Sequence, residues 1–112
     1  MTIAEVASAC DAEIILDGTA DCQISAAYTS DMLSDVMAHA PEDSVLITIQ
    51  SHVNTIAVCT LAGIKAVMVC HGRDITDDMI TAAKRENVGL LKTNLDQFTA
   101  SCRLVALSSA GT

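Results

Sequence analysis

Apolar residues are arranged along this chain in alternating blocks with the lengths of strands and helices. The clearest block, residues 44–49, is a nearly continuous β-branched run, which is typical of a strand covered on both faces. Apolar runs predict further extended segments at 13–16, 23–29, 64–70 and 89–92. Helical spacing or apolar composition predicts helices at 2–10, 32–39, 55–62 and 76–86, and a last helix that begins at Asn94. These elements account for most of the chain.

From residue 45 onward the predicted order is strand, helix, strand, helix, strand, helix. Such alternation indicates βαβ units, which place their strands in one parallel sheet. We therefore predict an α/β fold: a small parallel sheet of about four strands, including 45–49, 66–70 and 89–92, flanked by helices. With 112 residues, half of them apolar, the chain is expected to form one domain, residues 1–112.

Several helix features can be predicted individually. Thr2 and Glu5 have the spacing of a capping box, and Ser30 or Asp31 is expected to cap the helix over 32–39. The helix over 55–62 is apolar almost all round, which predicts burial. In the last helix the apolar residues with spacings of 3, 4 and 3 predict one packed face: Leu95, Phe98, Cys102 and Val105.

Charge and cysteine content narrow the classes of partner. The formal net charge is −8, and the six basic residues are scattered, so binding to nucleic acid or to an anionic membrane surface is not expected. The five cysteines include no C-x-x-C pair and are predicted to be reduced thiols. Neither a signal peptide nor a membrane-spanning segment is recognised, which predicts a cytoplasmic protein.

Motifs of self-sufficient enzymes are not found. The five glycines fit neither the dinucleotide-binding nor the P-loop pattern, and the nucleophile elbow and the H-E-x-x-H motif are also lacking. We therefore predict no enzyme activity, no catalytic residues, no cofactor and no metal site. Cys70 and His71 are adjacent but should point to opposite sides of their strand, which disfavours a shared metal.

Two polar loops are the candidate ligand site. Each follows a predicted strand, and ligands of open parallel sheets bind at the carboxyl ends of the strands. The helix after the first loop also offers free backbone N–H groups to an anion. The alternative is that Ser51 or Asn54 only caps that helix and His52 is solvated. The candidate residues are Gln50, Ser51, His52, Asn54, His71 and Arg73.

Three stretches carry a resemblance to a known family. They are residues 28–37 (YTSDMLSDVM) with Ala40-Pro41-Glu42, residues 45–54 (VLITIQSHVN) and residues 62–72 (AGIKAVMVCHG). Together they resemble the DRTGG domain family, and residues 3–24 fit the same family's N-terminal part. Such domains are similar to the N-terminal domain of HPr kinase/phosphorylase and also occur in some phosphotransacetylases.

The resemblance implies a small regulatory or ligand-sensing module. The Asp-Arg-Thr-Gly-Gly signature is absent from the expected region, Asp21 to Ala27, so no binding residue is carried over from it. The resemblance also does not extend to the nucleotide-binding domain of the kinase, and it implies no kinase activity.

Three functions remain open at this point. The first is a non-catalytic regulatory domain that binds an anionic small molecule or a partner protein. The second is a small enzyme with His52 as acid or base and His71 or Arg73 holding an anion. The third is a structural oligomerisation domain, since the high apolar content of a small chain favours self-association, with a homodimer as the simplest form.

Overall fold

Within residues 1–19 and 22–110, which the computed structural model describes, one sheet of five strands is covered by five helices. The strand order is β1-β5-β4-β3-β2. Four of these strands run parallel to one another: β2 (Ala26–Thr29), β3 (Ser44–Thr48), β4 (Ala66–Val69) and β5 (Gly89–Lys92). The predicted α/β class and parallel sheet are therefore confirmed.

One edge strand departs from the parallel pattern. β1 (Glu13–Leu16) pairs with β5 in the antiparallel direction. Only a short connection separates β1 from α1 (Ile3–Ala9), and the chain then crosses to β2 at the opposite edge of the sheet. The β1 segment was expected to be a strand, but the sequence did not give its direction or partner.

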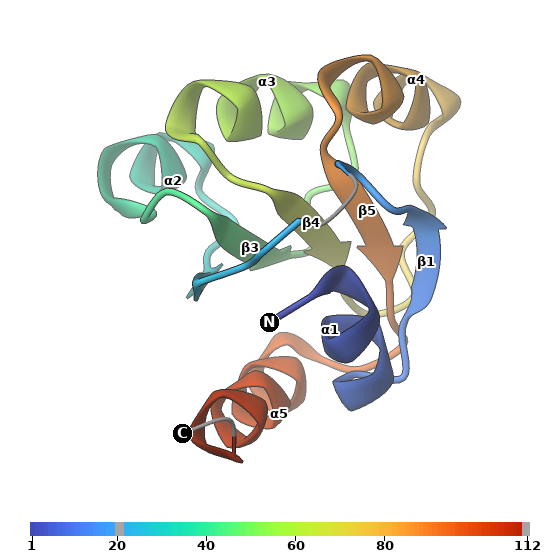
Figure 1. Cartoon of the computed structure of the whole chain (residues 1–112). Coiled ribbons are helices and arrows are strands. Elements are labelled where there is room, and N and C mark those ends of the chain that lie inside the picture. Colours follow the sequence, from blue (N-terminus) through green and yellow to red (C-terminus); the bar gives the residue numbers. More distant parts are fainter. Residues whose placement is uncertain (20–21, 111–112) are drawn as a thin grey trace.

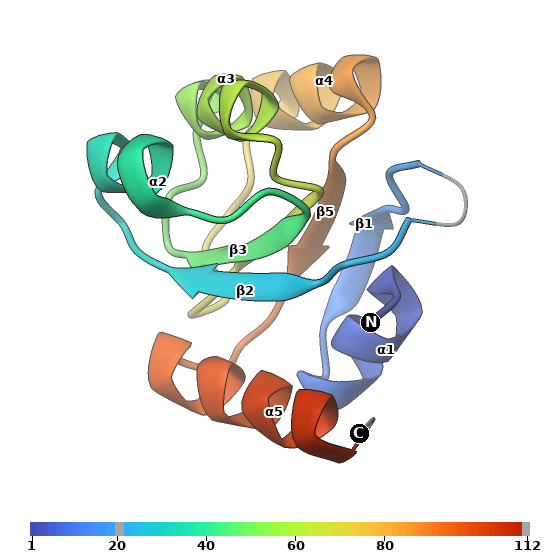
Figure 2. The same ribbon diagram turned by 60° about the vertical axis from the view of Figure 1, so that its left-hand side comes forward.

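The helices form two layers around the sheet (Figures 1 and 2). α2 (Leu33–His39), α3 (Val53–Ala62) and α4 (Asp77–Glu86) lie on one face, while α1 and α5 (Gln97–Ala110) lie on the other. Each face has its own buried cluster, one centred on Ile47, Met68 and Leu91 and the other on Leu46, Val67 and Leu90. Successive side chains of β3, β4 and β5 thus pack against the helices on opposite faces of the sheet. Both sets are buried, which explains the nearly continuous apolar sequences of these strands.

Two predicted helix starts can be compared with the structure. Thr2 and Glu5 form the capping box, in which each side chain accepts a hydrogen bond from the other's backbone N–H. The cap predicted for α2 was wrong: Met32 is the N-cap residue, and Ser30 Oγ accepts from the Met32 N–H at 3.2 Å. Asp31 does not cap this helix because its carboxylate is used by β3 and α5 instead.

Two predicted buried faces were also wrong. The buried residues of α3 are Thr55, Ile56 and Cys59, whereas Leu61 is 75% exposed. In α5 the core residues are Ala100 and Leu104, whereas Phe98 is 78% and Val105 66% exposed. Both helices carry apolar residues on more than one side, so the periodicity of the sequence could not show which side packs against the sheet.

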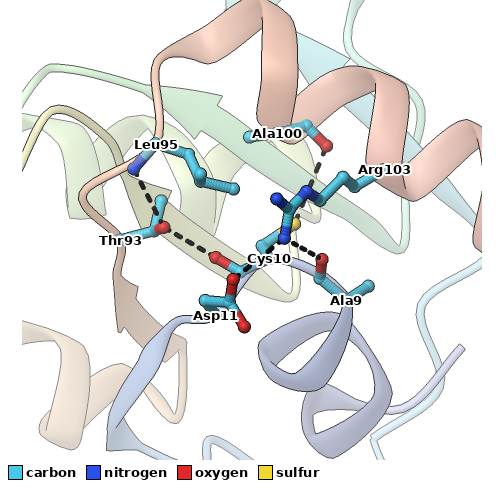
Figure 3. A network of polar contacts seen from close by, with 7 residues as sticks. All are labelled: Ala9, Cys10, Asp11, Thr93, Leu95, Ala100 and Arg103. Atoms are coloured by element: carbon cyan, nitrogen blue, oxygen red, sulfur yellow. Dashed lines mark hydrogen bonds and ion pairs between the residues drawn. The ribbon is translucent and has the colours of Figure 1, made fainter.

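A small polar network holds α1 and α5 together (Figure 3). Thr93 Oγ1 donates to the Cys10 carbonyl at 2.7 Å and accepts from the Leu95 N–H at 3.2 Å. Arg103 reaches from α5 to the end of α1, where it donates to the Ala9 carbonyl at 3.3 Å and pairs with Asp11 at 2.9 Å. The network fixes the start and the middle of α5 against α1.

The cysteines are free thiols. Cys10, Cys59 and Cys70 are buried, Cys22 is half-buried and Cys102 is exposed. Over the described part of the chain, every helix is too short or too polar to cross a bilayer. Asp21, the first residue of the region where the Asp-Arg-Thr-Gly-Gly signature was expected, lies outside the described residues.

Candidate functional site

The two predicted loops leave the sheet side by side. β3 and β4 are paired in parallel, with Thr48 opposite Val69, and the Cys70 N–H donates to the Thr48 carbonyl at 2.9 Å. The chain continues from the carboxyl end of β3 into residues 49–52 and from that of β4 into residues 70–76. The strand adjacency on which the candidate site depends is therefore present.

The first loop is anchored through Gln50. Its backbone N–H donates to Thr48 Oγ1 at 3.1 Å, and its side-chain Nε2 donates to the Asp31 carbonyl at 2.8 Å. Ser51 is half-buried, while His52 and Asn54 are exposed. His52 is the N-cap residue of α3, and among the described residues its side chain makes no capping hydrogen bond. The imidazole thus stands at the positive end of α3.

The second loop is a tight turn built on left-handed backbone. His71 and Gly72 have φ values of 62° and 61°, and the Arg73 N–H donates to the Cys70 carbonyl at 3.3 Å. The His71 and Gly72 N–H groups donate to the carbonyls of Leu95 and Thr93 at 2.9 and 2.8 Å. The turn is therefore held against the β5–α5 connection, and it presents the exposed side chains of His71 and Arg73.

Asp31 organises this edge of the sheet, although the sequence analysis gave it only a capping role. Its Oδ1 atom accepts from Thr48 Oγ1 at 2.9 Å, the Ile49 N–H at 2.9 Å and Gln97 Nε2 at 3.0 Å. One carboxylate thus joins the β2–α2 connection to β3 and α5. Its place just after the predicted extended segment 23–29 was the available signal, since parallel strands of one sheet end at the same edge.

A second acid lies close to His71. The Thr99 N–H donates to Asp96 Oδ1 at 2.7 Å, and this bond lowers the pKa of the Asp96 carboxyl. The Coulomb interaction with the His71 imidazole lowers the pKa of Asp96 further. The edge therefore combines the bases predicted from the sequence with carboxylates from the β5–α5 and β2–α2 connections, and its potential is more mixed than the sequence suggested.

Thr55, in the first turn of α3, has an unpaired hydroxyl. The residue is fully buried, and among the described side chains its Oγ1 is the buried polar atom that has no hydrogen-bond partner. Leaving such a group unpaired costs about 1–3 kcal/mol. Its backbone N–H donates to the His52 carbonyl at 3.0 Å, which places Thr55 directly behind the first loop.

The arrangement presents hydrogen-bond donors and positive charge at one edge of the sheet. The side chains of His52, Asn54 and Arg73 are exposed donors, and the first N–H groups of α3 add a partial positive charge. Asp31, by contrast, already accepts three hydrogen bonds through one oxygen. A phosphate or carboxylate group is the ligand chemistry that these donors fit.

Comparisons with known proteins bear on the fold. Neither a protein-family model nor a curated protein sequence matches the chain. The structure is similar to a crystal structure of the CBS and DRTGG domains of the regulatory region of Clostridium perfringens pyrophosphatase, which was determined in complex with its activator, diadenosine tetraphosphate. The TM-score is 0.73 at 18% sequence identity, over 93% of this chain and 46% of that one. The chain thus shares the fold of part of that region and spans about half its length.

Proposed function

We propose that this chain is a non-catalytic regulatory module, a single DRTGG-like domain over residues 1–112, that senses an anionic small molecule at the carboxyl edge of its sheet. The ligand-binding residues are Gln50, Ser51, His52, Asn54, His71 and Arg73. The observation that carries the proposal is the parallel pairing of β3 with β4, because it brings both polar loops to one edge.

Two further observations support the proposal. The unpaired hydroxyl of Thr55 lies in the first turn of α3, where a bound molecule or an ordered water would supply a partner. The structurally similar pyrophosphatase region is regulatory and binds a phosphate-rich nucleotide activator. A nucleotide or another phosphate ester is therefore the first ligand class to test.

The enzyme alternative has less support. Catalysis by His52 needs a group that orients the imidazole, and among the described residues the His52 side chain makes no capping hydrogen bond. Hydrolysis of ATP or of a nitrophenyl phosphate by the purified protein, if lost in His52→Ala and retained in His39→Ala, would replace the regulatory proposal with the enzymatic one. We expect no such turnover.

Binding is tested by thermal denaturation in the presence of diadenosine tetraphosphate, ATP, AMP and inorganic phosphate. A ligand at one hundred times its dissociation constant adds about 2.7 kcal/mol to the free energy of unfolding. We expect at least one phosphate compound to raise the melting temperature of the wild type, and His52→Ala with Arg73→Ala to abolish that rise.

The controls are a histidine and an arginine outside the edge. His39 ends α2 and Arg85 lies in the last turn of α4, and both side chains are 69% exposed. His39→Ala and Arg85→Ala should keep the ligand-induced rise. If all variants lose the ligand-induced rise equally, the effect comes from a general loss of positive charge, and the proposed site is refuted.

Self-association is the remaining part of the proposal. We expect a homodimer in a cytoplasmic setting, with a partner protein as the alternative target of regulation. Symmetric homodimers are the commonest oligomers, and the exposed apolar side chains of α3 and α5 offer two faces for one.

A further inference from the structure

The outward side of α5 is an apolar seam that the rest of the described chain leaves uncovered. The inner side of this helix, Ala100 and Leu104, is buried against the sheet, while Phe98, Cys102 and Val105 are exposed on the other side. In both views of the ribbon a long side of α5 faces away from every other element (Figures 1 and 2). The seam residues are separated by four and three positions, the spacing by which two packed helices meet.

We propose that this seam is the interface with a second copy of the chain, whose α5 packs antiparallel across a two-fold axis near Cys102. The inference rests on the self-association proposed above and names the face that carries it. In this arrangement Phe98 of each copy lies over Val105 of the other, because residues at equal distances from the axis face each other.

Charge favours this seam as the self-contact. Each chain has 14 acidic residues and a net charge of −8, so acidic side chains brought face to face in a self-contact would add to the repulsion between two copies. α5 contains no Asp or Glu, and its one charged residue, Arg103, is directed toward Asp11 and the end of α1 (Figure 3). A contact through the seam therefore places no carboxylate of α5 against the second copy.

A hollow beside the seam is large enough for a side chain of the second copy. It lies between α5 and β2, has a volume of about 310 Å³, and is lined mainly by apolar groups of Met1, Ala27, Ile47, Leu104 and Val105. Since Val105 borders both the hollow and the seam, the opposing Phe98 ring enters it in the antiparallel pairing. Buried aromatic side chains in such pockets are the usual energetic centres of interfaces.

The apolar side of α3 is the competing face. It has a hollow of about 270 Å³ near Val53, Ala57 and Leu61, but Arg85 and Glu86 of α4 border that hollow. Burying those charges in a self-contact would carry a desolvation cost. For this reason α5 is the favoured face, and α3 supplies the matched control.

The interface is tested with the full chain by sedimentation velocity between about 1 and 100 μM, a range that populates micromolar dimers. The wild type should have twice the monomer mass of 11.7 kDa. Phe98→Glu should raise the dissociation constant about 100-fold, a hot-spot effect, with an unchanged far-ultraviolet spectrum. Leu61→Glu, at a side chain of similar exposure (75% against 78%), should remain dimeric.

Cys102 reports the register of the pair. Diamide takes two electrons and two protons from two thiols, and a disulfide forms between them. Near the axis the two Cys102 residues should cross-link into a covalent dimer, which Cys102→Ser abolishes and Cys22→Ser leaves intact. A dimer that Phe98→Glu disrupts but diamide does not cross-link would overturn the antiparallel register.

The remaining outcomes separate the interface from the self-association. A dimer that is insensitive to Phe98→Glu, or is dissociated by Leu61→Glu alone, would overturn the assignment to α5. A wild type that is monomeric at 100 μM would overturn both the interface and the proposed self-association, and would leave the ligand-binding proposal unaffected.

Discussion

Gln97, in the first turn of α5, donates a hydrogen bond from its Nε2 to Oδ1 of Asp31 at 3.0 Å, across 66 positions of the chain. The same oxygen binds Thr48 and the Ile49 N–H, so it links elements from both helical layers to the end of β3. The loop that contains His52 is thus positioned by a residue outside the predicted ligand-binding set.

Replacing Asp31 should therefore destabilise the fold and disturb the candidate site. Asp31→Ala leaves three donors without an acceptor, and we expect a loss of about 2–3 kcal/mol in the free energy of unfolding. Asp31→Asn retains an acceptor oxygen at nearly the same place and should lose less. Urea denaturation measures both values, and equal losses in the two variants would contradict the hydrogen-bond explanation.

Thiol reactivity should follow burial. Burial raises the pKa values of Cys59 and Cys70 to about 12, whereas Cys102 is exposed. Because the thiolate is the nucleophile, a disulfide reagent at pH 8 should modify Cys102 within minutes and leave Cys59 and Cys70 intact until the protein unfolds. Mass spectrometry of peptides from partly modified protein would identify the order of reaction.

The same shifts determine behaviour in alkali. Each of these thiols has a pKa of about 12 in the folded chain and about 9 in the unfolded chain. The stability that this difference contributes is complete only below pH 9. As the pH rises from 9 toward 12, the unfolded state ionises first and stability falls. Cys59→Ala should weaken this dependence, although the cavity it leaves lowers stability at every pH. A dependence as steep as that of the wild type would contradict the assignment.

The strands β3, β4 and β5 could be predicted from the sequence because each is a short, largely apolar run. The position of the two polar loops at one edge of the sheet could be predicted from the parallel arrangement of β3 and β4 alone. The direction of β1 could not be predicted, since it depends on pairing with β5, more than 70 residues away. A pattern over a few neighbouring residues carries no information about a partner strand so far along the chain.

The buried side of α5 was missed for a related reason. Both Phe98–Cys102–Val105 and Ala100–Leu104 have helical spacing, and the larger side chains made the first set look like the core. In the structure Ala100 and Leu104 face the sheet. The position of α5 against α1 is maintained by the contacts of Thr93 and Arg103. Within the site, the role of Asp31 was missed because its partners lie 17 to 66 positions away.

Two glycines with positive φ should differ in their tolerance of alanine. A Cβ on Gly18 would stand 2.8 Å from the backbone nitrogen of Gly89, whereas on Gly72 it would stand 2.6 Å from the end of the Asn94 side chain. A side chain can move aside more easily than a strand, so Gly18→Ala should cost more stability than Gly72→Ala. We expect at least about 1 kcal/mol from the backbone strain in each. Thermal denaturation checks the order, and the reverse order would contradict it.

The pKa of Tyr28 should depend on one acidic partner. Its hydroxyl donates to Asp35 Oδ2 at 2.7 Å, which raises the pKa of Tyr28 above its usual value near 10 and lowers that of Asp35. As the only tyrosine, in a chain without tryptophan, Tyr28 can be followed alone by its phenolate absorbance. Asp35→Asn should return the midpoint toward 10, because the ionised acceptor is lost. His39→Ala is the control: it removes the ion pair of Asp35 with His39 but leaves the hydrogen bond between Tyr28 and Asp35, so the midpoint should remain raised.

The stability that this hydrogen bond contributes should be present below pH 10 and should decline as the pH rises through the raised pKa of Tyr28. The same midpoint in the wild type and in Asp35→Asn would show that the bond does not form in solution.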